Sequence, residues 1–385
     1  MRVTIVADVL GIENNGTTIT AINFINSLKE RGHEVSVVCP DENKTGLYGY
    51  YVVPSLNLGI FNDYVKKNNI TLAKADTNII TEAIKNADIV HIMMPFFLGT
   101  KAARIARRLN KPITAGFHVQ AENFTNHVFM MDFPAANLLT YKVFYRLLYR
   151  FVDAIHYPTQ FIRDVFEGQT SSKTNGYVIS NGVNKAFAPR QVAKPEHLKD
   201  RYVILFTGRY SREKSHKILI DAVKLSKYKD KIQLVFAGDG PQKENIINRS
   251  SDLANVPILG FHPREELIDI INYADLYVHP AEIEIEAISC LEAMSCGLVP
   301  VIADSKRSAT RYFALSPDNL FRCNDPLDLA HKIDYWLDHP QEKEDCRQKY
   351  IEYAKRFDFD YSMDQMEKML IDVIKLNDEK KERLS

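Results

Sequence analysis

Residues 284–300 read EIEAISCLEAMSCGLVP, directly after a turn that follows a strand-like apolar run at 276–279. Two of the carboxylates, Glu284 and Glu292, are eight residues apart, one just before a predicted helix over 287–294 and one inside it. The first turn of a helix presents free backbone N–H groups and the positive end of its dipole, which suit a diphosphate. The segment therefore predicts an anion-binding strand–loop–helix unit flanked by carboxylates that can accept hydrogen bonds from hydroxyl groups.

The same alternation of apolar runs and helical patterns continues on both sides of this segment. The predicted strands are 3–7, 34–39, 88–93, 113–117, 203–207, 233–237, 276–279 and 299–303, and the predicted helices are about 17–31, 99–110, 215–225, 265–272 and 287–294. This βαβ order indicates an α/β fold with parallel sheets covered on both faces.

A polar stretch at 168–176 interrupts the alternation, which then restarts. A chain of 385 residues has room for two domains, which we place at 1–170 and 177–357. Ser362 and Gln365 have the spacing of a capping box, which predicts a last helix over 363–376. The charged residues 378–385 are expected to fray.

The composition narrows the function classes. Lys and Arg together number 49, as do Asp and Glu, and this balance argues against nucleic acid as a partner. The five cysteines form no C-x-x-C pair, which argues against a disulfide framework and favours the reducing cytoplasm. The N-terminus enters a strand without a signal-peptide layout, and no apolar run approaches the ~20 residues of a membrane span. We therefore expect a cytoplasmic protein that at most lies on a membrane.

A second charged motif, FTGRYSREKS, occupies residues 206–215. Arg209 and Lys214 stand between a predicted strand end and a predicted helix start, where two cations can neutralise a diphosphate. Taken alone, the segment is equally typical of a solvated loop. The turns VISNGVN at 178–184, FAGDGP at 236–241 and LGFHPREEL at 259–267 are also ordinary by themselves.

The order and spacing of these five motifs resemble those of glycosyltransferase family 4. The resemblance implies the GT-B fold, in which two Rossmann-like domains face each other across a cleft and the last helix, here about 359–385, returns to the first domain. At 285–288 the usual Gly-Phe-Gly-Leu is replaced by Ile-Glu-Ala-Ile, which adds the carboxylate of Glu286. The residues that the resemblance assigns to donor binding are Asn181, Gly208, Asp239, His262, Ala287, Ile288 and Glu292, and those that it assigns to catalysis are His118, Arg209, Lys214 and Glu284.

The first domain matches more weakly. Residues 14–18 read NNGTT between the first strand and the first helix. Gly16, with Thr17 beside it, would let the backbone approach a donor phosphate. The alternative is that Thr17 or Thr18 simply caps the helix. The loop lacks the G-x-G-x-x-G of a nicotinamide enzyme. His118 follows the strand 113–117 and resembles the active-site histidine of the family, although a lone histidine is often structural.

The resemblance also implies a retaining reaction by same-face attack, in which the leaving phosphate takes the acceptor proton. No cofactor is expected, because the nucleotide-sugar is a substrate. No metal is expected either: Arg209 and Lys214 would do the work of a divalent ion, and Asp358-Phe359-Asp360 is interpreted as polar surface.

A local excess of positive charge in residues 99–151 bears on the identity of the acceptor. Lys142, Arg146 and Arg150 recur every four residues, which predicts one basic face on a helix near 138–151 with aromatic side chains around it. Such a helix suits an anionic membrane, unless it is a core-packed helix with a solvated stripe. Residues 99–151 contain only two acidic residues, Glu122 and Asp132. They contain eight basic residues: Lys101, Arg104, Arg107, Arg108, Lys111, Lys142, Arg146 and Arg150.

Residues 282–297 also resemble those of bacterial diacylglycerol glucosyltransferases. We therefore expect transfer of a hexose, from UDP-glucose or a similar donor, to a membrane glycolipid or diacylglycerol. The alternatives are a soluble or polysaccharide acceptor, a GT-B nucleotide-sugar 2-epimerase, and a sugar-nucleotide sensor without catalysis.

Overall fold

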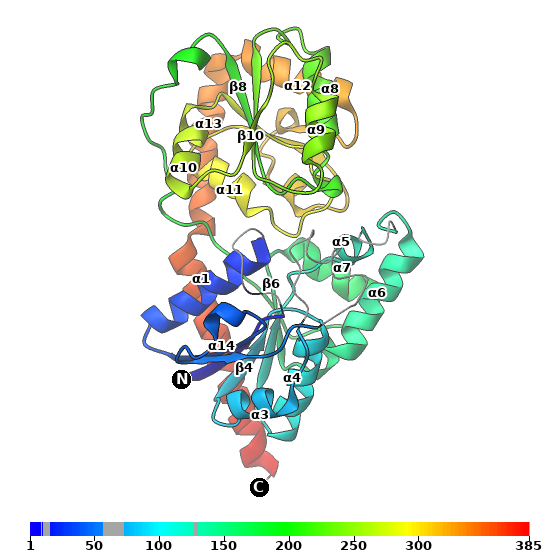
Figure 1. Cartoon of the computed structure of the whole chain (residues 1–385), viewed down its shortest axis with the longest axis vertical. Helices are drawn as coiled ribbons and strands as arrows, with labels where there is room; N and C mark the ends of the chain where they lie inside the picture. The colour runs from blue at the N-terminus through cyan, green and yellow to red at the C-terminus, as the bar shows by residue number, and fades with distance from the viewer. Residues whose placement is uncertain (9, 11–15, 57–72, 127–129, 385) are drawn as a thin grey trace. The chain divides into compact units, whose positions relative to one another are not determined.

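The computed structural model describes residues 1–8, 10, 16–56, 73–126 and 130–384. The chain divides into unit 1, Met1–Asn181 with Tyr361–Ser385, and unit 2, Gly182–Asp360 (Figure 1). The division falls after β7 (Gly176–Val178), so this strand belongs to the first unit rather than to the second.

Unit 1 is built on a parallel sheet. Its described strands lie in the order β3-β2-β1-β4-β5-β6-β7, and all their described pairings are parallel. The inner strands are short apolar runs buried on both faces, as a parallel sheet covered by helices requires, whereas the edge strands are partly exposed. They are β1 (Arg2–Val6), β2 (Glu34–Cys39), β3 (Tyr50–Val52), β4 (Ile89–Ile92), β5 (Ile113–Gly116), β6 (Ala154–Tyr157) and β7.

Helices connect these strands in the right order for βαβ crossovers. The described α-helices of unit 1 are α1 (Gly16–Glu30), α3 (Thr77–Ile84), α4 (Phe97–Arg108), α5 (Ala121–Asn126), α6 (Pro134–Leu147), α7 (Gln160–Thr170) and α14 (Phe359–Leu384), and the short 3-10 turns are η1 (Glu42–Lys44) and η3 (Tyr149–Phe151).

Unit 2 repeats this architecture with strand order β10-β9-β8-β11-β12-β13, again with parallel pairings throughout its described strands. The strands are β8 (Tyr202–Thr207), β9 (Ile232–Ala237), β10 (Ile258–Gly260), β11 (Leu276–His279), β12 (Pro300–Asp304) and β13 (Leu320–Arg322). The helices are α8 (His216–Leu225), α9 (Lys243–Arg249), α10 (Arg264–Tyr273), α11 (Ile288–Ser295), α12 (Pro326–Asp338) and α13 (Pro340–Ala354), with 3-10 turns η4 (Glu196–Leu198), η5 (Arg212–Lys214), η6 (Ala309–Phe313), η7 (Pro317–Asn319) and η8 (Lys355–Phe357).

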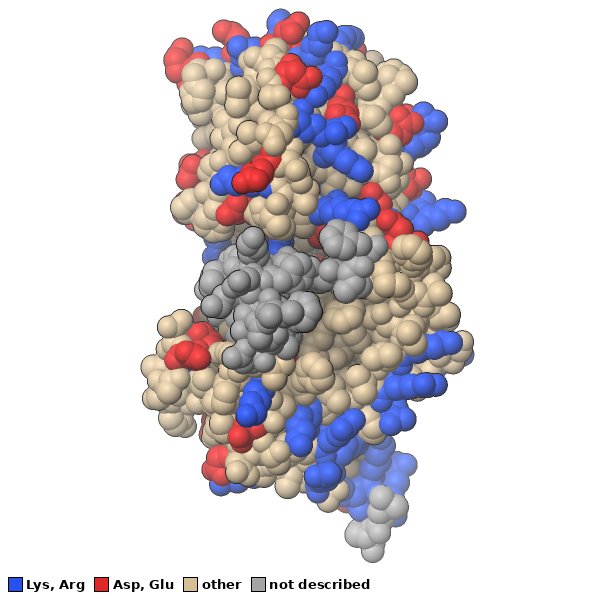
Figure 2. All heavy atoms as spheres, turned by 45° about the vertical axis from the view of Figure 1, so that its right-hand side comes forward, with Lys and Arg blue, Asp and Glu red and all other residues tan. Residues whose placement is uncertain are grey.

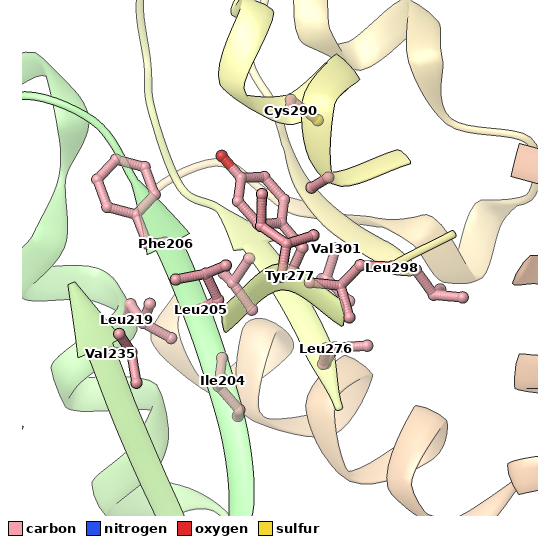
Figure 3. Close-up of a cluster of buried hydrophobic side chains, with 14 of the residues drawn as sticks. Ile204, Leu205, Phe206, Leu219, Val235, Leu276, Tyr277, Cys290, Leu298 and Val301 are labelled. Atoms are coloured by element: carbon pink, nitrogen blue, oxygen red, sulfur yellow. The ribbon is translucent and has the colours of Figure 1, made fainter. Parts of the chain in front are cut away.

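The core of unit 2 lies between this sheet and its helices. Side chains of β8 and β11, among them Leu205, Phe206 and Tyr277, meet Leu219 of α8 and Cys290 of α11 (Figure 3). All of these side chains are fully buried. This packing fixes the positions at which β8 and β11 end.

The two sheets confirm the α/β fold class with two doubly wound, Rossmann-like units. In such sheets a ligand binds beyond the carboxyl ends of the strands, where the strand order reverses. The reversal lies between β1 and β4 in unit 1 and between β8 and β11 in unit 2. The loops that follow these four strands are therefore the expected positions of ligand-binding residues.

Helix α14 belongs to unit 1, although the chain reaches it through unit 2. Glu367 lies 2.7 Å from His33 Nε2 and 3.2 Å from a guanidinium nitrogen of Arg31. The apolar face is buried through Met363, Met366, Met369, Leu370 and Val373.

The start and end that the capping box predicted for this last helix were wrong, whereas the bounds of about 359–385 that the resemblance implied are confirmed. The helix begins at Phe359, with Ser362 buried inside its first turns, and continues to Leu384 instead of fraying from residue 378. The backbone N–H of Phe359 donates to the carbonyl of Val183 at 3.1 Å, so a tertiary contact sets where the chain enters the helix.

The predicted basic helix near 138–151 is also corrected. Helix α6 ends at Leu147, and Arg150 lies in the following turn η3. The aromatic side chains expected around the cations face inward instead: Tyr141, Phe144 and Tyr149 are buried, and the Tyr149 ring packs 5.1 Å from the rings of Phe117 and Phe166.

Candidate active site

The predicted residues Lys214 and Glu284 come together in unit 2. Lys214 ends η5, after β8, and Glu284 lies in the loop after β11, the neighbouring strand across the reversal. The Lys214 ammonium group forms an ion pair with Glu284, and the Nε2 atom of His279 lies 3.1 Å from the same carboxylate oxygen. A cation, a carboxylate and an imidazole thus meet where the fold places ligands.

The carboxyl group of Glu284 is held in its ionised form. Burial by itself would raise its pKa, but Lys214 and His279 outweigh burial and lower the pKa to about 2. At neutral pH, Glu284 is therefore an acceptor of hydrogen bonds only.

His279 is a site residue that sequence reasoning missed. The side chain is fully buried, and burial lowers its pKa, although Glu284 acts to raise it. Because Glu284 can only accept, we assign the proton of the neutral ring to Nε2. The Tyr277 hydroxyl lies 3.2 Å from the other ring nitrogen, Nδ1, and holds the orientation of the ring. Its place at the end of β11 was the signal that could have identified it.

Glu282 was missed as well, although it stands in the same loop. Its carboxylate pairs with Arg307 at 2.6 Å and accepts from the Ser215 hydroxyl at 3.3 Å. Its backbone carbonyl accepts from the Ser305 hydroxyl at 2.6 Å, and its backbone N–H donates to Glu213 at 2.9 Å. Glu282 therefore ties the loops after β8, β11 and β12 into one structure.

Ala287 and Ile288 form the start of α11. Ala287 has φ +57°, the left-handed region, and provides no side-chain cap for the helix. Ala287 stands where the family pattern has its second glycine, and its Cβ makes the left-handed conformation cost roughly 1 kcal/mol. The uncapped first turn leaves backbone N–H groups available to an anion.

Glu292 lies one turn further along α11. The residue remains partly exposed at its edge, but protein surrounds its carboxyl group, and burial raises its pKa to about 8 against a weaker opposite effect of Arg264. The group is therefore largely protonated at neutral pH and can both donate and accept a hydrogen bond.

Tyr210 links the turns that contain Gly208 and Asp239. The backbone N–H of Tyr210 donates to the Asp239 carbonyl at 2.9 Å, and its hydroxyl accepts from the Gly260 N–H at 3.1 Å. A Cβ at Gly238 would lie 2.0 Å from the Gly208 carbonyl oxygen, so only glycine fits there. The three turns at 206–215, 236–241 and 259–267 thereby form one edge of the sheet.

The remaining predicted donor residues are His262, Asn181 and Arg209. His262 lies in the turn before α10, with Nδ1 2.8 Å from Glu266 of that helix. Asn181 is the last residue of unit 1. Arg209 directly follows Gly208 and is partly exposed at the end of β8.

His118 of unit 1 follows β5. Its ring lies over Gly116, where a Cβ would be 2.3 Å from Nε2, and meets the ring of His156 edge-on at 5.3 Å. Burial, followed by His156 and His91, lowers the pKa of His118 well below its usual range. The ring is therefore neutral and can hydrogen-bond an uncharged hydroxyl.

Gly16 and Thr17 are the first residues of α1, and Asn14 and Asn15 lie outside the described residues. Thr17 and Thr18 both lie inside the helix, so neither is its N-cap.

Asp8, which sequence reasoning missed, stands at the reversal of the unit 1 sheet. Its carboxylate accepts from the backbone N–H groups of Leu98 at 3.0 Å and Gly99 at 3.2 Å. It caps α4, whose own N-cap residue Phe96 offers no side-chain hydrogen bond. Burial raises the pKa of Asp8 to about 7, although these hydrogen bonds act to lower it.

The described residues show neither a metal-binding cluster nor a membrane-spanning helix. They contain no group of three or more His, Cys, Asp or Glu side chains arranged to hold a metal ion. In the same part of the chain, no helix combines the length and the apolar character needed to cross a bilayer.

Comparison with known proteins assigns both halves of the chain. The family model described as glycosyl transferases group 1 matches residues 187–357, and the one described as glycosyltransferase family 4 matches residues 14–187. A GDP-mannose-dependent alpha-mannosyltransferase of Corynebacterium glutamicum is 28% identical over 78% of this chain and 72% of that protein. An alpha-monoglucosyldiacylglycerol synthase of Streptococcus pneumoniae is 24% identical over 79% of this chain and 71% of that protein.

A solved structure supports the fold. Anabaena HepE in complex with UDP-glucose matches with a TM-score of 0.73 and 18% identity, covering 97% of this chain and all of that one. The two family models cover residues 14–357 in succession. The chain therefore belongs to family 4 of the glycosyltransferases, and it is a transferase with the GT-B fold.

Proposed function

We propose that the enzyme transfers glucose from UDP-glucose, with retention of configuration, to a lipid acceptor such as diacylglycerol. The observation that carries the chemistry is the meeting of Lys214, Glu284 and His279 beside the uncapped start of α11. It combines a positive charge and free N–H groups for a diphosphate with an ionised carboxylate for sugar hydroxyls.

The diphosphate carries the developing negative charge when the bond from the sugar C1 to the phosphate oxygen breaks. Arg209, Lys214 and the N–H groups at Ala287 and Ile288 would stabilise that charge, as would the backbone at Gly16 and Thr17. No step in this scheme needs a metal ion.

The sugar would be oriented by Glu284 and by the neutral ring of His118. The new bond forms between C1 and the acceptor oxygen on the face that the phosphate leaves, and the acceptor proton passes to the leaving phosphate. The α-linked donor then gives an α-linked product. Glu292 would hold the ribose, with Asn181, Gly208, Asp239 and His262 along the rest of the nucleotide.

The choice of glucose and of a lipid rests on two supports. The streptococcal relative is named for the glucosylation of diacylglycerol, and the basic segment 99–151 favours an acceptor held in an anionic membrane. The mannosyltransferase relative makes GDP-mannose the competing donor.

The test is product analysis with radiolabelled UDP-glucose, UDP-galactose, UDP-N-acetylglucosamine and GDP-mannose, each with short-chain diacylglycerol, with a soluble oligosaccharide, or with neither. We expect a glucolipid from UDP-glucose that an α-glucosidase cleaves. Product formed only from GDP-mannose would refute UDP-glucose as the donor. Product formed only on the oligosaccharide would refute the lipid as the acceptor. Conversion of the free nucleotide-sugar to an epimer would refute the transfer itself, and release of free sugar alone would refute the acceptor.

A further inference from the structure

The outward face of α6 carries an exposed apolar row. Leu139, Val143 and Leu147 follow one another at four-residue spacing and are 64%, 39% and 39% exposed. This spacing places the three side chains on one face of the helix. The inward face is already packed through Tyr141 and Phe144, so the row takes no part in the core of unit 1.

Three cations adjoin this row. Lys142 and Arg146 are exposed on the same face, and Arg150 follows in η3 with its guanidinium 4.5 Å from the centre of the Phe151 ring. None of the three forms an ion pair with a described residue, whereas Arg107 on α4 is paired with Asp153 at 2.9 Å. The α6 surface is defined as Leu139, Lys142, Val143, Arg146, Leu147 and Arg150.

The positive charge extends beyond α6. Arg104 and Arg108 on α4 are exposed, and they too are unpaired within the described chain. In Figure 2, Lys and Arg side chains spread over the right-hand side of the visible face of unit 1, while Asp and Glu lie mainly on its left. On a protein with equal numbers of acidic and basic residues, this excess is local.

Helix α6 also packs beside the helix that follows His118 in the chain. Helix α5 begins three residues after His118, and Phe124 in α5 is 46% exposed. The Phe124 ring lies 5.9 Å from the ring of Phe144 on the inner side of α6. Helix α5, which follows the loop of His118 in the chain, therefore packs against the inner side of α6.

We infer that the α6 surface docks the enzyme on an anionic lipid bilayer. An apolar row beside unpaired cations matches the two components of such an interface, the acyl boundary and the negatively charged headgroups. Nucleic acid would satisfy the cations but would leave the apolar row in water. The inference rests on the proposed lipid acceptor, because an enzyme bound to the bilayer meets an acceptor that does not leave it.

The test is sedimentation of the full-length protein with phosphatidylcholine vesicles, with and without phosphatidylglycerol, at low and high salt. We expect binding that requires phosphatidylglycerol and weakens with salt. The variant Lys142→Gln/Arg146→Gln/Arg150→Gln should bind about 100-fold more weakly at low salt. The variant Leu139→Gln/Val143→Gln/Leu147→Gln should keep the salt dependence but also lose affinity.

The matched control is Lys229→Gln/Lys231→Gln/Lys349→Gln, which removes the same charge from three exposed lysines of unit 2 and should bind as the parent does. Thermal unfolding checks that every variant folds. Equal binding by the α6 charge variant and this control would overturn the inference, as would a parent that never binds the charged vesicles.

A separate measurement distinguishes failure of docking from failure of the proposed function. Transfer to a short-chain, dispersed diacylglycerol should be the same for the parent and both α6 variants, because this acceptor does not require a bilayer. Loss of that activity in well-folded variants would place the α6 surface in acceptor binding and would refute docking as its role. A parent inactive on this acceptor would refute the proposed function and leave the vesicle result standing.

Discussion

Lys214→Met removes the cation that keeps Glu284 ionised while retaining most of the apolar stem of the side chain. The two side chains are only 18% and 11% exposed, so little solvent screens the pair. The pKa of Glu284 falls from 4.5 to about 2 in the folded protein, which corresponds to roughly 3 kcal/mol of stability at neutral pH. His279 remains as a partner in the variant, so we expect a loss of about 1–3 kcal/mol, below that of a fully buried and wholly unpaired charge.

The pH dependence of stability is a second measure of the ion pair between Lys214 and Glu284. Because the folded pKa lies below the unfolded one, the stabilisation is complete above about pH 4.5 and is lost as the pH falls toward 2. In Lys214→Met the folded pKa rises, so the variant should lose less further stability than the parent between pH 5 and pH 3. Urea unfolding at pH 7, 5 and 3 measures both effects.

A double variant separates stability from catalysis. Lys214→Met/Glu284→Gln removes the Glu284 carboxylate together with its cation and should recover most of the stability that Lys214→Met loses. Its turnover should nevertheless stay ~10²-fold or more below that of the parent, the scale of losing one group that stabilises transition-state charge. Lys227→Met is the control, because its ion pair with Asp338 is exposed and lies away from the site, and it should change neither quantity measurably.

Two results would refute this reasoning. If Lys214→Met unfolds like the parent at every pH, the ammonium group does not compensate the buried carboxylate. If it turns over donor at nearly the parental rate, Lys214 does not act on the diphosphate.

Four further predictions follow from the same contacts. Arg209→Ala should lower turnover by ~10²-fold or more, and near-normal kcat would remove Arg209 from the phosphate site. Activity should survive excess EDTA; complete loss that magnesium or manganese restores would contradict the metal-free mechanism. Truncation after Arg356 removes the five buried apolar side chains of α14, each contributing roughly 1.5–3 kcal/mol. That sum is comparable with the whole stability of a typical domain, so the fragment should be misfolded by circular dichroism, and a fully active fragment would show that α14 is dispensable. Gly238→Ala places a Cβ 2.0 Å from the Gly208 carbonyl and should cost about 1–3 kcal/mol in urea unfolding, whereas parental stability would mean that the turn adapts.

Local patterns were sufficient where the structure depends on a period. The strand over 34–39 lies where it was predicted, and the helix predicted over 215–225 begins one residue later, because burial on a sheet or on one helix face requires the alternation that the sequence displays. The exposure of Lys142 and Arg146 followed from the same four-residue spacing.

Predictions failed where a distant segment competes with a local signal. The capping pattern at Ser362 is overridden by the backbone contact of Phe359 with Val183. The aromatic residues near α6 turn inward because α7 and the residue after β5 provide Phe166 and Phe117 as partners. Neither partner can be recognised from the local sequence.

The sequence by itself determined the βαβ alternation, the family motifs and the loops that follow the predicted strands. Only the tertiary structure decided which of those loops meet. Lys214 and Glu284 are 70 residues apart in the chain and touch because β8 and β11 are neighbours at the point where the strand order reverses. The same holds for Asp8 and the start of α4, 90 residues away. The protonation states were decided there too: burial pushes the pKa of Glu292 up to about 8, whereas Lys214 and His279 pull that of Glu284 down to about 2. Two carboxyl groups of one motif differ in this way because desolvation and nearby charge belong to a place in the fold and not to a position in the sequence.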